Sequence, residues 1–184
     1  MGSIPVTVAV IDSAVGPLTA GVTDEGLALL EFSDPARLDP QLAALKRWFG
    51  ATGFGRHPML DQITAELAEY FAGTRHRFEI PLVIRGTPFQ EEVWRALLTI
   101  PYGATCAYSD IAGRLGRRNG QRAVGLANGQ NRIAIVIPCH RVIERAGGLR
   151  GYGGGLARKK FLLDLERRGQ DPLAGTPLGA GHER

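Results

Sequence analysis

The sequence predicts an α+β (mixed α/β) protein with two units: a small N-terminal α+β domain and a helical C-terminal domain with a winged helix-turn-helix. In the first unit, runs of Val, Leu and Ile between turn formers indicate strands, and apolar residues three or four positions apart indicate helices. In the second unit, short helical segments precede a stretch with six glycines between residues 147 and 155. Such a stretch is typical of a loop, and here it resembles the wing of a winged helix.

The first 85 residues contain strand-like runs followed by helix-like segments. Val6–Ile11 and Gly26–Phe32 are rich in Val, Leu and Ile, and the turn formers between them predict a hairpin or a meander. Helical spacing of apolar residues predicts helices over 38–49 and 59–71. Residues 75–84 alternate in part between apolar and polar side chains, which predicts a further strand.

The start of a helix marks the boundary between the two units. Thr87 can cap this helix, Pro88 suits its first position, and Gln90 stands three residues after the cap, so together they make a capping box. We expect the helix to cover 88–100, because Pro101 cannot continue it. The predicted units are 1–85, the N-terminal domain; 86–169, the helical domain; and 170–184, a flexible tail.

Two short helices around a tight turn that contains glycine indicate a helix-turn-helix. The first helix covers 108–116 and the second 120–128, and several arginines lie in and around them. Residues 132–137 form a β-branched run, which predicts a short buried strand. The glycine-rich loop covers 145–155, and the last helix covers 156–168.

Charge is distributed unevenly along the chain. Residues 1–100 contain 8 Lys and Arg against 12 Asp and Glu, whereas residues 101–184 contain 14 against 6. This segregation favours a second unit that binds a polyanion, although a solvated basic surface would explain the charge equally well without a motif. No stretch is long and apolar enough to span a membrane, and no secretory signal is evident, so we expect a cytoplasmic protein without a membrane partner.

The pair Cys139-His140, at the end of the predicted buried strand, points to nucleophilic chemistry. A thiolate is a strong nucleophile, and an adjacent imidazole can take up the thiol proton. Glu166 is a candidate for the carboxylate that orients the imidazole, whereas Asp164 points about 200° away on the same helix. We expect this arrangement to lower the pKa of Cys139. An inert, buried Cys-His pair is the alternative interpretation, and it is favoured for Cys106, which has no base nearby in sequence.

Several further segments match one family in order and spacing. They are Phe89-Gln90-Glu91-Glu92-Val93-Trp94, Ile100-Pro101-Tyr102-Gly103, Arg122-Ala123-Val124-Gly125, Asn131, Pro138-Cys139-His140-Arg141-Val142 and Gly151-Tyr152-Gly153-Gly154-Gly155-Leu156. With these segments the sequence resembles the O6-alkylguanine-DNA alkyltransferases, also called methylated-DNA–protein-cysteine methyltransferases. The resemblance extends from about residue 86 to residue 166. The first 85 residues resemble the family's variable N-terminal domain only in length and in the layout of strands and helices.

The resemblance implies direct-reversal DNA repair. The alkyl group of O6-alkylguanine, and also that of O4-alkylthymine, would move irreversibly to Cys139 in a single turnover that inactivates the protein. His140 would act as the base through a bound water, Glu166 would hold that histidine, and Asn131 would tie the recognition helix to the active-site turn. The family also implies an RNase H-like fold for the N-terminal domain.

The resemblance further implies contacts with a flipped nucleotide in double-stranded DNA that contains alkylated guanine. Tyr108 would contact the flipped guanine and rotate its phosphate outward, and Arg122 would fill the gap in the base stack. The predicted base-pocket residues are Val142, Tyr152 and Gly153, and the predicted DNA contacts beside Arg122 are Ser109, Arg118, Ala123 and Asn128. A monomer is expected, in the bacterial cytoplasm or nucleoid if the source is prokaryotic, and cooperative binding along DNA stays open.

Two departures from the family pattern matter. Gly153 stands where the family often has a serine whose hydroxyl and amide face guanine O6, so a side-chain donor there is in doubt. No cysteine precedes Cys106, so we expect no zinc, and we expect no other metal or cofactor.

Three other classes of function compete with this interpretation. A non-catalytic DNA-binding or damage-recognition protein of the alkyltransferase-like type would lack the acceptor cysteine, so Cys139 argues against it. A winged-helix transcription regulator would explain the basic half of the chain but not the Cys-His pair. A cysteine hydrolase would release its product and would turn over.

Overall fold

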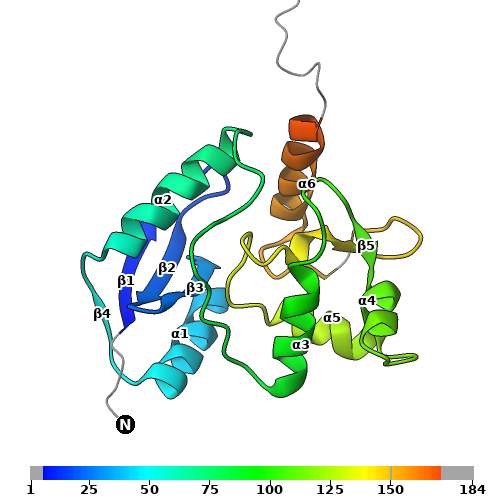
Figure 1. The fold of residues 1–184 in the computed structure, drawn as a ribbon, viewed down its shortest axis with the longest axis horizontal. Coiled ribbons are helices and arrows are strands. Elements are labelled where there is room, and N and C mark those ends of the chain that lie inside the picture. The colour runs from blue at the N-terminus through cyan, green and yellow to red at the C-terminus, as the bar shows by residue number, and fades with distance from the viewer. Residues whose placement is uncertain (1–5, 150, 171–184) are drawn as a thin grey trace, which may run out of the picture.

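The computed structural model describes residues 6–149 and 151–170 of the 184-residue chain, which form two lobes that lie side by side (Figure 1). Within these residues, the N-terminal lobe is a four-stranded sheet with helices, and the C-terminal lobe is mostly helical with a two-stranded sheet. The predicted α+β class with a helical second unit is therefore confirmed.

The N-terminal sheet contains β1 (Val6–Ile11), β2 (Leu18–Thr23), β3 (Gly26–Phe32) and β4 (Thr52–Phe54), in the order β3-β2-β1-β4. The first three strands form an antiparallel meander, and β4 lies parallel to β1. The sequence predicted β1, β3 and the meander, but it did not predict β2 and β4 as strands. Every residue of β2 is buried, so its sequence lacks the alternation that indicates a strand, and β4 has only three residues.

Helices α1 (Pro35–Phe49) and α2 (Pro58–Phe71) cover opposite faces of this sheet (Figure 1). Leu45 of α1 belongs to one buried apolar cluster with Val6, whereas Ile63 of α2 belongs to a second and larger cluster. Both helices begin slightly earlier than predicted, because each has a proline at its start, where the missing N–H costs no hydrogen bond.

The C-terminal lobe contains the predicted helix-turn-helix. Its elements are α3 (Pro88–Leu97), β5 (Cys106–Ala107), α4 (Tyr108–Arg114), α5 (Gln121–Gly129), the 3-10 helix η1 (Cys139–Arg141), β6 (Val142–Ile143) and α6 (Leu156–Gln170). The predicted capping box is present: the Thr87 hydroxyl accepts from the Gln90 amide, and the Gln90 side chain accepts from the Thr87 amide. Residue 170, assigned to the tail from the sequence, is the last residue of α6, and the rest of the predicted tail, 171–184, lies outside the described residues.

Two of the predicted strands are wrong. Residues 75–84 and 132–137 are irregular, and each contributes a single bridge to β3. β3 is the edge strand of the N-terminal sheet, so both segments lie along its outer side. The bridges join Leu27 to Leu82 and Leu30 to Ile133.

The segment 132–137 starts as a partner of β3 and then turns sharply. The Leu30 amide donates to the Arg132 carbonyl at 2.8 Å, and the Ala134 amide donates to the Leu30 carbonyl at 2.7 Å. The chain then turns through Ile135, whose φ of 71° ends any extended conformation. The β-branched run was correctly expected to be buried. It is buried as an irregular turn that packs against β3, and not as a strand.

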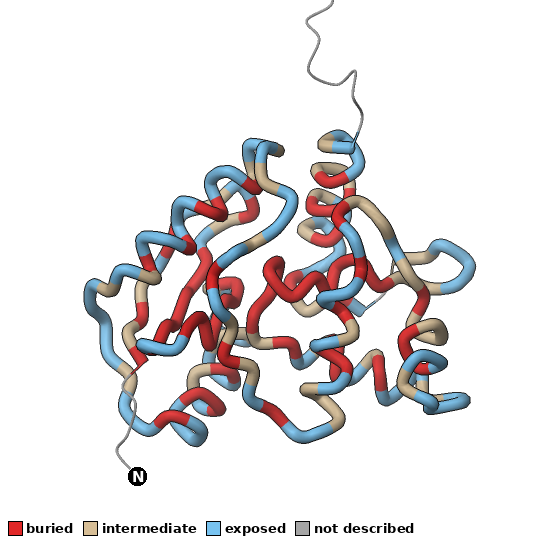
Figure 2. Tube along the Cα trace, in the orientation of Figure 1, coloured by how far each residue is buried: buried red, intermediate tan, exposed pale blue. Residues whose placement is uncertain are grey.

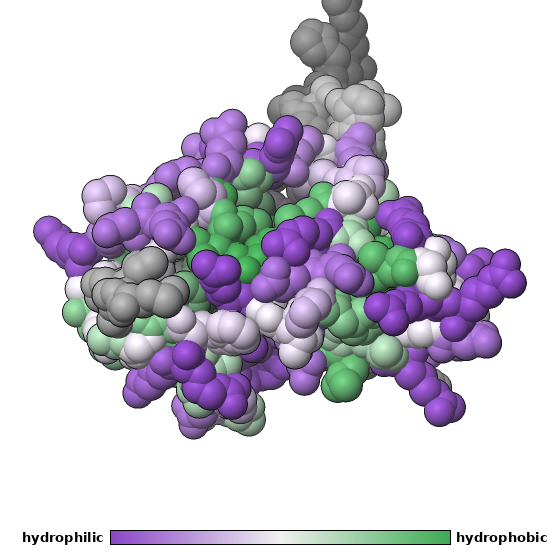
Figure 3. Space-filling model, turned by 60° about the horizontal axis from the view of Figure 1, so that its bottom comes forward, coloured by the Kyte–Doolittle hydropathy of each residue, from purple (hydrophilic) through white to green (hydrophobic). Residues whose placement is uncertain are grey.

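The two lobes share a core. One cluster of buried apolar residues extends from the α2 face of the sheet, including Leu30 and Phe32, to Trp94 and Cys139 in the C-terminal lobe. Figure 2 shows buried segments on both sides of the lobe boundary. In Figure 3, apolar side chains come to the surface between the lobes, and hydrophilic side chains surround them. The domain boundary near residue 85 therefore stays a prediction, because the two lobes share one apolar core and are not separated by their packing.

Candidate active site

Cys139 is the first residue of η1, and it is 5% exposed. The Asn131 side-chain amide donates to the Ile137 carbonyl at 2.8 Å and to Cys139 Sγ at 3.1 Å. The Asn128 amide donates to the Cys139 carbonyl at 3.3 Å. These bonds connect the end of α5 to the turn that holds the thiol.

His140 and Glu166 form a buried ion pair or hydrogen-bonded pair beside the thiol. His140 Nε2 lies 2.7 Å from Glu166 Oε1, and both side chains are 0% exposed. His140 Nδ1 is also buried and has no hydrogen-bond partner among the described residues. Asp164, which was predicted to point away from the imidazole, pairs instead with Lys160 at the surface. The structure therefore selects Glu166 as the carboxylate that orients the imidazole.

Glu166 accepts hydrogen bonds from both lobes. Arg141 donates through Nε to Oε2 at 2.8 Å and through Nη2 to Oε1 at 2.9 Å. The Gly103 amide donates to Oε2 at 2.9 Å, and the Tyr70 hydroxyl on α2 donates to Oε1 at 2.8 Å. Sequence reasoning gave none of these three residues a role. Arg141 and Gly103 lie in the matched segments, which was a usable signal, whereas Tyr70 looks like an ordinary core residue of an amphipathic helix.

These contacts decide the protonation states of the pair. Burial alone would raise the pKa of Glu166, but the hydrogen bonds and charges of His140 and Arg141 outweigh it and lower the pKa to about 2. Burial lowers the pKa of His140, although Glu166 opposes that shift. At neutral pH an ionised Glu166 therefore accepts the Nε2 hydrogen of a neutral His140, and Nδ1 is able to accept a proton.

The prediction of a lowered pKa for Cys139 is wrong for this structure. Burial raises the pKa of the thiol, because a thiolate in an apolar core is poorly solvated, and the hydrogen bond from Asn131 only partly offsets this. Glu31 raises the pKa further, whereas Arg37 and Lys159 lower it. The thiol therefore rests protonated at neutral pH, and its proton must leave during a reaction.

Of the three predicted base-pocket residues, two are buried and the third is partly buried. Val142 and Tyr152 belong to the same core cluster as Cys139. The Val142 carbonyl accepts a hydrogen bond from the buried Lys159 ammonium at 2.6 Å. Gly153 follows Tyr152 and is half-buried. Sequence reasoning missed Lys159, which nonetheless lies within the stretch that resembles the family.

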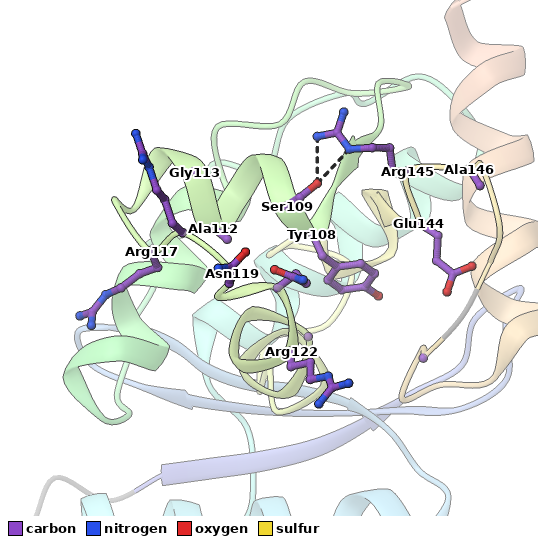
Figure 4. Close-up of a pocket in the computed structure, with 14 residues that line it drawn as sticks. Tyr108, Ser109, Ala112, Gly113, Arg117, Asn119, Arg122, Glu144, Arg145 and Ala146 are labelled. Carbon is purple, nitrogen blue, oxygen red and sulfur yellow. Dashed lines mark hydrogen bonds between the residues drawn. The ribbon is translucent and has the colours of Figure 1, made fainter.

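A cavity of about 930 Å³ opens between α4, α5 and the loop after β6 (Figure 4). Tyr108 from α4 and Arg122 from α5 both line it, and so do Ser109 and Arg118. Ser109 accepts a hydrogen bond from Arg145 at 2.9 Å, drawn in Figure 4. Four of the predicted contact residues therefore meet around one opening, and the added arginine is paired with Asp110 at 2.6 Å.

Two other predicted DNA contacts lie elsewhere on α5. Ala123 is exposed next to Arg122, as a contact residue should be. Asn128 is 2% exposed and donates to the Cys139 carbonyl. The prediction of a DNA contact for Asn128 is therefore wrong, because this side chain faces the core and supports the active-site turn.

The cavity and the thiol are separate in this structure. Cys139 is buried and is not among the residues that line the cavity. The described residues contain no group of three or more His, Cys, Asp and Glu side chains that could hold a metal ion. None of the helices in residues 6–149 and 151–170 is long and apolar enough to cross a membrane. The site itself presents a buried thiol, followed in the chain by a histidine that is bonded to Glu166.

Comparison with known proteins gives this geometry a family. Residues 6–84 match the model of the 6-O-methylguanine DNA methyltransferase ribonuclease-like domain, and residues 88–168 match the model of its DNA binding domain. The first match agrees with the RNase H-like fold that the resemblance implied for the N-terminal domain.

Relatives match over most of their length. The methylated-DNA–protein-cysteine methyltransferase of Mycobacterium bovis is 47% identical over 161 residues, which cover 85% of this chain and 90% of the relative. That of Methanosarcina acetivorans is 40% identical, over 86% of this chain and 96% of the relative. The crystal structure of Mycobacterium tuberculosis OGT in complex with DNA is similar with a TM-score of 0.76 and 42% identity, over 90% of this chain and 94% of that one. The chain therefore belongs to the 6-O-methylguanine DNA methyltransferase family, whose curated members here are the methylated-DNA–protein-cysteine methyltransferases.

Proposed function

We infer that this protein repairs DNA by transferring the alkyl group of O6-alkylguanine to Sγ of its own Cys139, in a single turnover. The observation that supports this most directly is a buried thiol, bonded to Asn131 and followed by a histidine that Glu166 orients, in a chain whose two halves both match the family. The relatives' names give the same reaction, and one relative is solved with DNA.

The proposed transfer is a displacement at the alkyl carbon. The thiol proton passes to His140 Nδ1, through a water in the family, and the ionised Glu166 stabilises the imidazolium that results. The bond between Sγ and the alkyl carbon forms as the bond between that carbon and guanine O6 breaks. The electron pair stays on guanine, which then takes up one proton. The net change moves the alkyl group from oxygen to sulfur and a proton from sulfur to guanine.

The proposed DNA-binding face contains α4, α5 and the arginines around the cavity. A guanine inside the duplex cannot reach a buried thiol, so the nucleotide must leave the stack, at a cost of a few kcal/mol. In this proposal Tyr108 contacts the extruded nucleotide, and Arg122 occupies the gap it leaves. Because Cys139 does not line the cavity, binding of the base also has to open a path to the thiol.

Other parts of the proposal concern the protein's surroundings. We propose that it acts as a monomer in the cytoplasm or nucleoid, that it also accepts O4-alkylthymine, and that cooperative association along DNA is an outcome to be measured. The excess of basic residues after residue 100 supports DNA as the polyanion.

A non-catalytic damage-recognition protein is the alternative function. It would use the same helix-turn-helix and cavity, but it would need no nucleophile. The thiol, the histidine and the carboxylate form a connected set in this chain, which favours transfer over recognition alone.

Intact-protein mass after incubation with duplex DNA that contains O6-methylguanine tests the proposal. Wild-type protein should gain one methyl group permanently, and Cys139→Ala should gain none while still binding the duplex. Cys106→Ala is the matched control, because Cys106 is the other free cysteine and has no histidine pair; it should gain the group like the wild type. A lasting gain in Cys139→Ala, or no lasting gain in the wild type, would show the assignment to be wrong.

A further inference from the structure

Arg37 joins the N-terminal lobe to the end of the recognition helix. It lies in the first turn of α1, and its Nη1 donates to the carbonyl of Gly129, the last residue of α5, at 3.0 Å. Its Nη2 donates to Glu31 Oε2 at 2.7 Å. Its Nε is buried and makes no hydrogen bond to any residue that the structure describes. This donor is thus unsatisfied in the structure, which is costly for a buried group.

The guanidinium fills the space beside the glycine loop. A Cβ placed on Gly153 would lie 2.6 Å from both Nη atoms of Arg37, well inside the distance that two such atoms tolerate. Glycine at position 153 therefore lets Arg37 reach the loop that contains Tyr152. A larger side chain there would have to displace the guanidinium.

Glu31 holds the guanidinium in this place. The Glu31 side chain is 0% exposed, and it also accepts a hydrogen bond from the Gln41 amide at 3.4 Å. The Arg37 side chain is 27% exposed, so solvent and a ligand can approach it. A carboxylate that is fully buried fixes its partner, because losing the pair would leave an unpaired charge in the core.

Two cations act on the thiol, and they differ in how far they are exposed. The positive charges of Arg37 and Lys159 both favour a lower pKa of Cys139. The Lys159 ammonium is 0% exposed and bonded to the Val142 carbonyl. Arg37 is partly exposed, and its guanidinium lies against Gly153 in the loop that contains Tyr152. Arg37 is therefore the cation better placed to meet a substrate that approaches the sulfur.

We propose that Arg37, from the N-terminal lobe, is a catalytic residue that donates a hydrogen bond to the guanine oxygen from which the alkyl group leaves. This inference rests on the function proposed above. As the bond from sulfur to the alkyl carbon forms and the bond from that carbon to O6 breaks, the electron pair remains on guanine. Arg37 stabilises that charge and keeps its own protons, and guanine later takes up the proton released by the thiol. A positioned donor stabilises the transition state more than the ground state, because the negative charge on guanine develops only in the transition state.

The first test removes the donors and retains the length of the side chain. Arg37→Met should slow the single-turnover transfer about 100-fold at saturating protein, both on duplex DNA and on free O6-benzylguanine base. Arg37→Lys should be intermediate, because it retains a charge but not the fork of donors. Arg158→Gln is the control for lobe docking: Arg158 bonds to the Val15 carbonyl and to Asp34 across the same boundary, and its loss should leave the rate within about twofold of the wild type.

A second pair of variants separates a donor role from a folding role. Arg37→Met leaves the Glu31 carboxylate without its ionic partner, and the double variant Arg37→Met with Glu31→Gln removes the charge of that carboxylate as well. The double variant should have the thermal stability of the wild type, and its transfer rate should remain slow. Gly153→Ala should also be slow because it displaces the guanidinium, and it should have little further effect in the Arg37→Met background.

The outcomes are distinct. The inference would be overturned if the double variant Arg37→Met with Glu31→Gln recovered the wild-type rate, or if the loss of rate in Arg37→Met disappeared at saturating protein. It would also be overturned if the effects of Gly153→Ala and Arg37→Met were additive, or if Arg158→Gln lost as much rate as Arg37→Met. The wild-type mass experiment is independent of Arg37. If wild-type protein gains no alkyl group, the proposed function has failed; if it gains one and Arg37→Met is equally fast, only the inference about Arg37 has failed.

Discussion

Replacing Glu166 by glutamine removes the charge at the centre of the candidate active site and preserves the shape of the side chain. The pKa of Glu166 is about 2 in the folded protein, against an ordinary value of 4.5. This difference of about 2.5 units corresponds to about 3 kcal/mol of folding free energy at neutral pH. No discount for solvent applies, because the side chain is 0% exposed. Glutamine also leaves the guanidinium of Arg141 without its ionic partner, so we expect a loss of about 3 kcal/mol at pH 7.

The sign of the pH dependence follows from the direction of the shift. The folded-state pKa of Glu166 lies below its unfolded value, so its contribution is complete above about pH 4.5 and is lost as the pH falls toward 2. Glutamine binds no proton in this range. The difference in unfolding free energy between wild type and Glu166→Gln should therefore shrink by about 2 kcal/mol between pH 7 and pH 3.

Urea unfolding at pH 7, 5 and 3 measures this difference. Asp164→Asn is the matched control, because Asp164 lies two residues earlier on α6 and pairs with Lys160 at the surface, where solvent screens the pair. Its effect should be much smaller at every pH. A loss in Glu166→Gln that is the same at pH 7 and pH 3 would refute the reasoning, because it would mean that the ionised form of Glu166 is not favoured by the fold.

Three further predictions concern the reaction. Cys139→Ser should abolish alkyl transfer and leave duplex binding unchanged, because a serine hydroxyl is far harder to ionise than a thiol; transfer at a comparable rate, measured by intact mass, would exclude Cys139 as the nucleophile. Arg122→Ala should slow transfer strongly on duplex DNA but little on free O6-benzylguanine at saturating protein, and Arg122→Lys should rescue only in part; an equal loss on both substrates would assign Arg122 to the fold or the active site. The lowered pKa of His140 keeps the imidazole neutral at pH 7, so the single-turnover rate should fall only when the pH drops below about 6.5; an acid limb above pH 7 would contradict this.

Local signals were sufficient for much of the fold. The capping box at Thr87, the prolines at the helix starts and the glycine-containing turn between α4 and α5 act within a few residues, so the sequence displays them directly. The failures involve non-local pairing. Residues 132–137 have the composition of a strand. Their single bridge to Leu30 and the turn at Ile135 depend on the position of β3 in the folded protein.

The candidate site divides in the same way. Cys139, His140, Glu166 and Asn131 were predicted because they lie in segments with a recognisable order, and the structure brings them together. The direction of the thiol pKa was predicted wrongly, because adjacency in sequence says nothing about burial. A neighbouring histidine suggests a thiolate, yet the enclosing core favours the neutral thiol.

Three of the residues that sequence reasoning missed come from the other lobe. Tyr70 of α2 donates to Glu166, Gln41 of α1 donates to the Asn131 carbonyl at 3.4 Å, and Arg37 bonds to the end of α5. Each looks like a surface or core residue of an amphipathic helix, because its partner lies about 90 positions away in the chain. The hydrogen bonds between Leu30 and the segment after Arg132 fix the edge of the N-terminal sheet against the turn that leads to Cys139. The N-terminal lobe therefore does more than cover the C-terminal lobe: it supplies part of the hydrogen bonding that holds the carboxylate, the asparagine and the thiol in one arrangement.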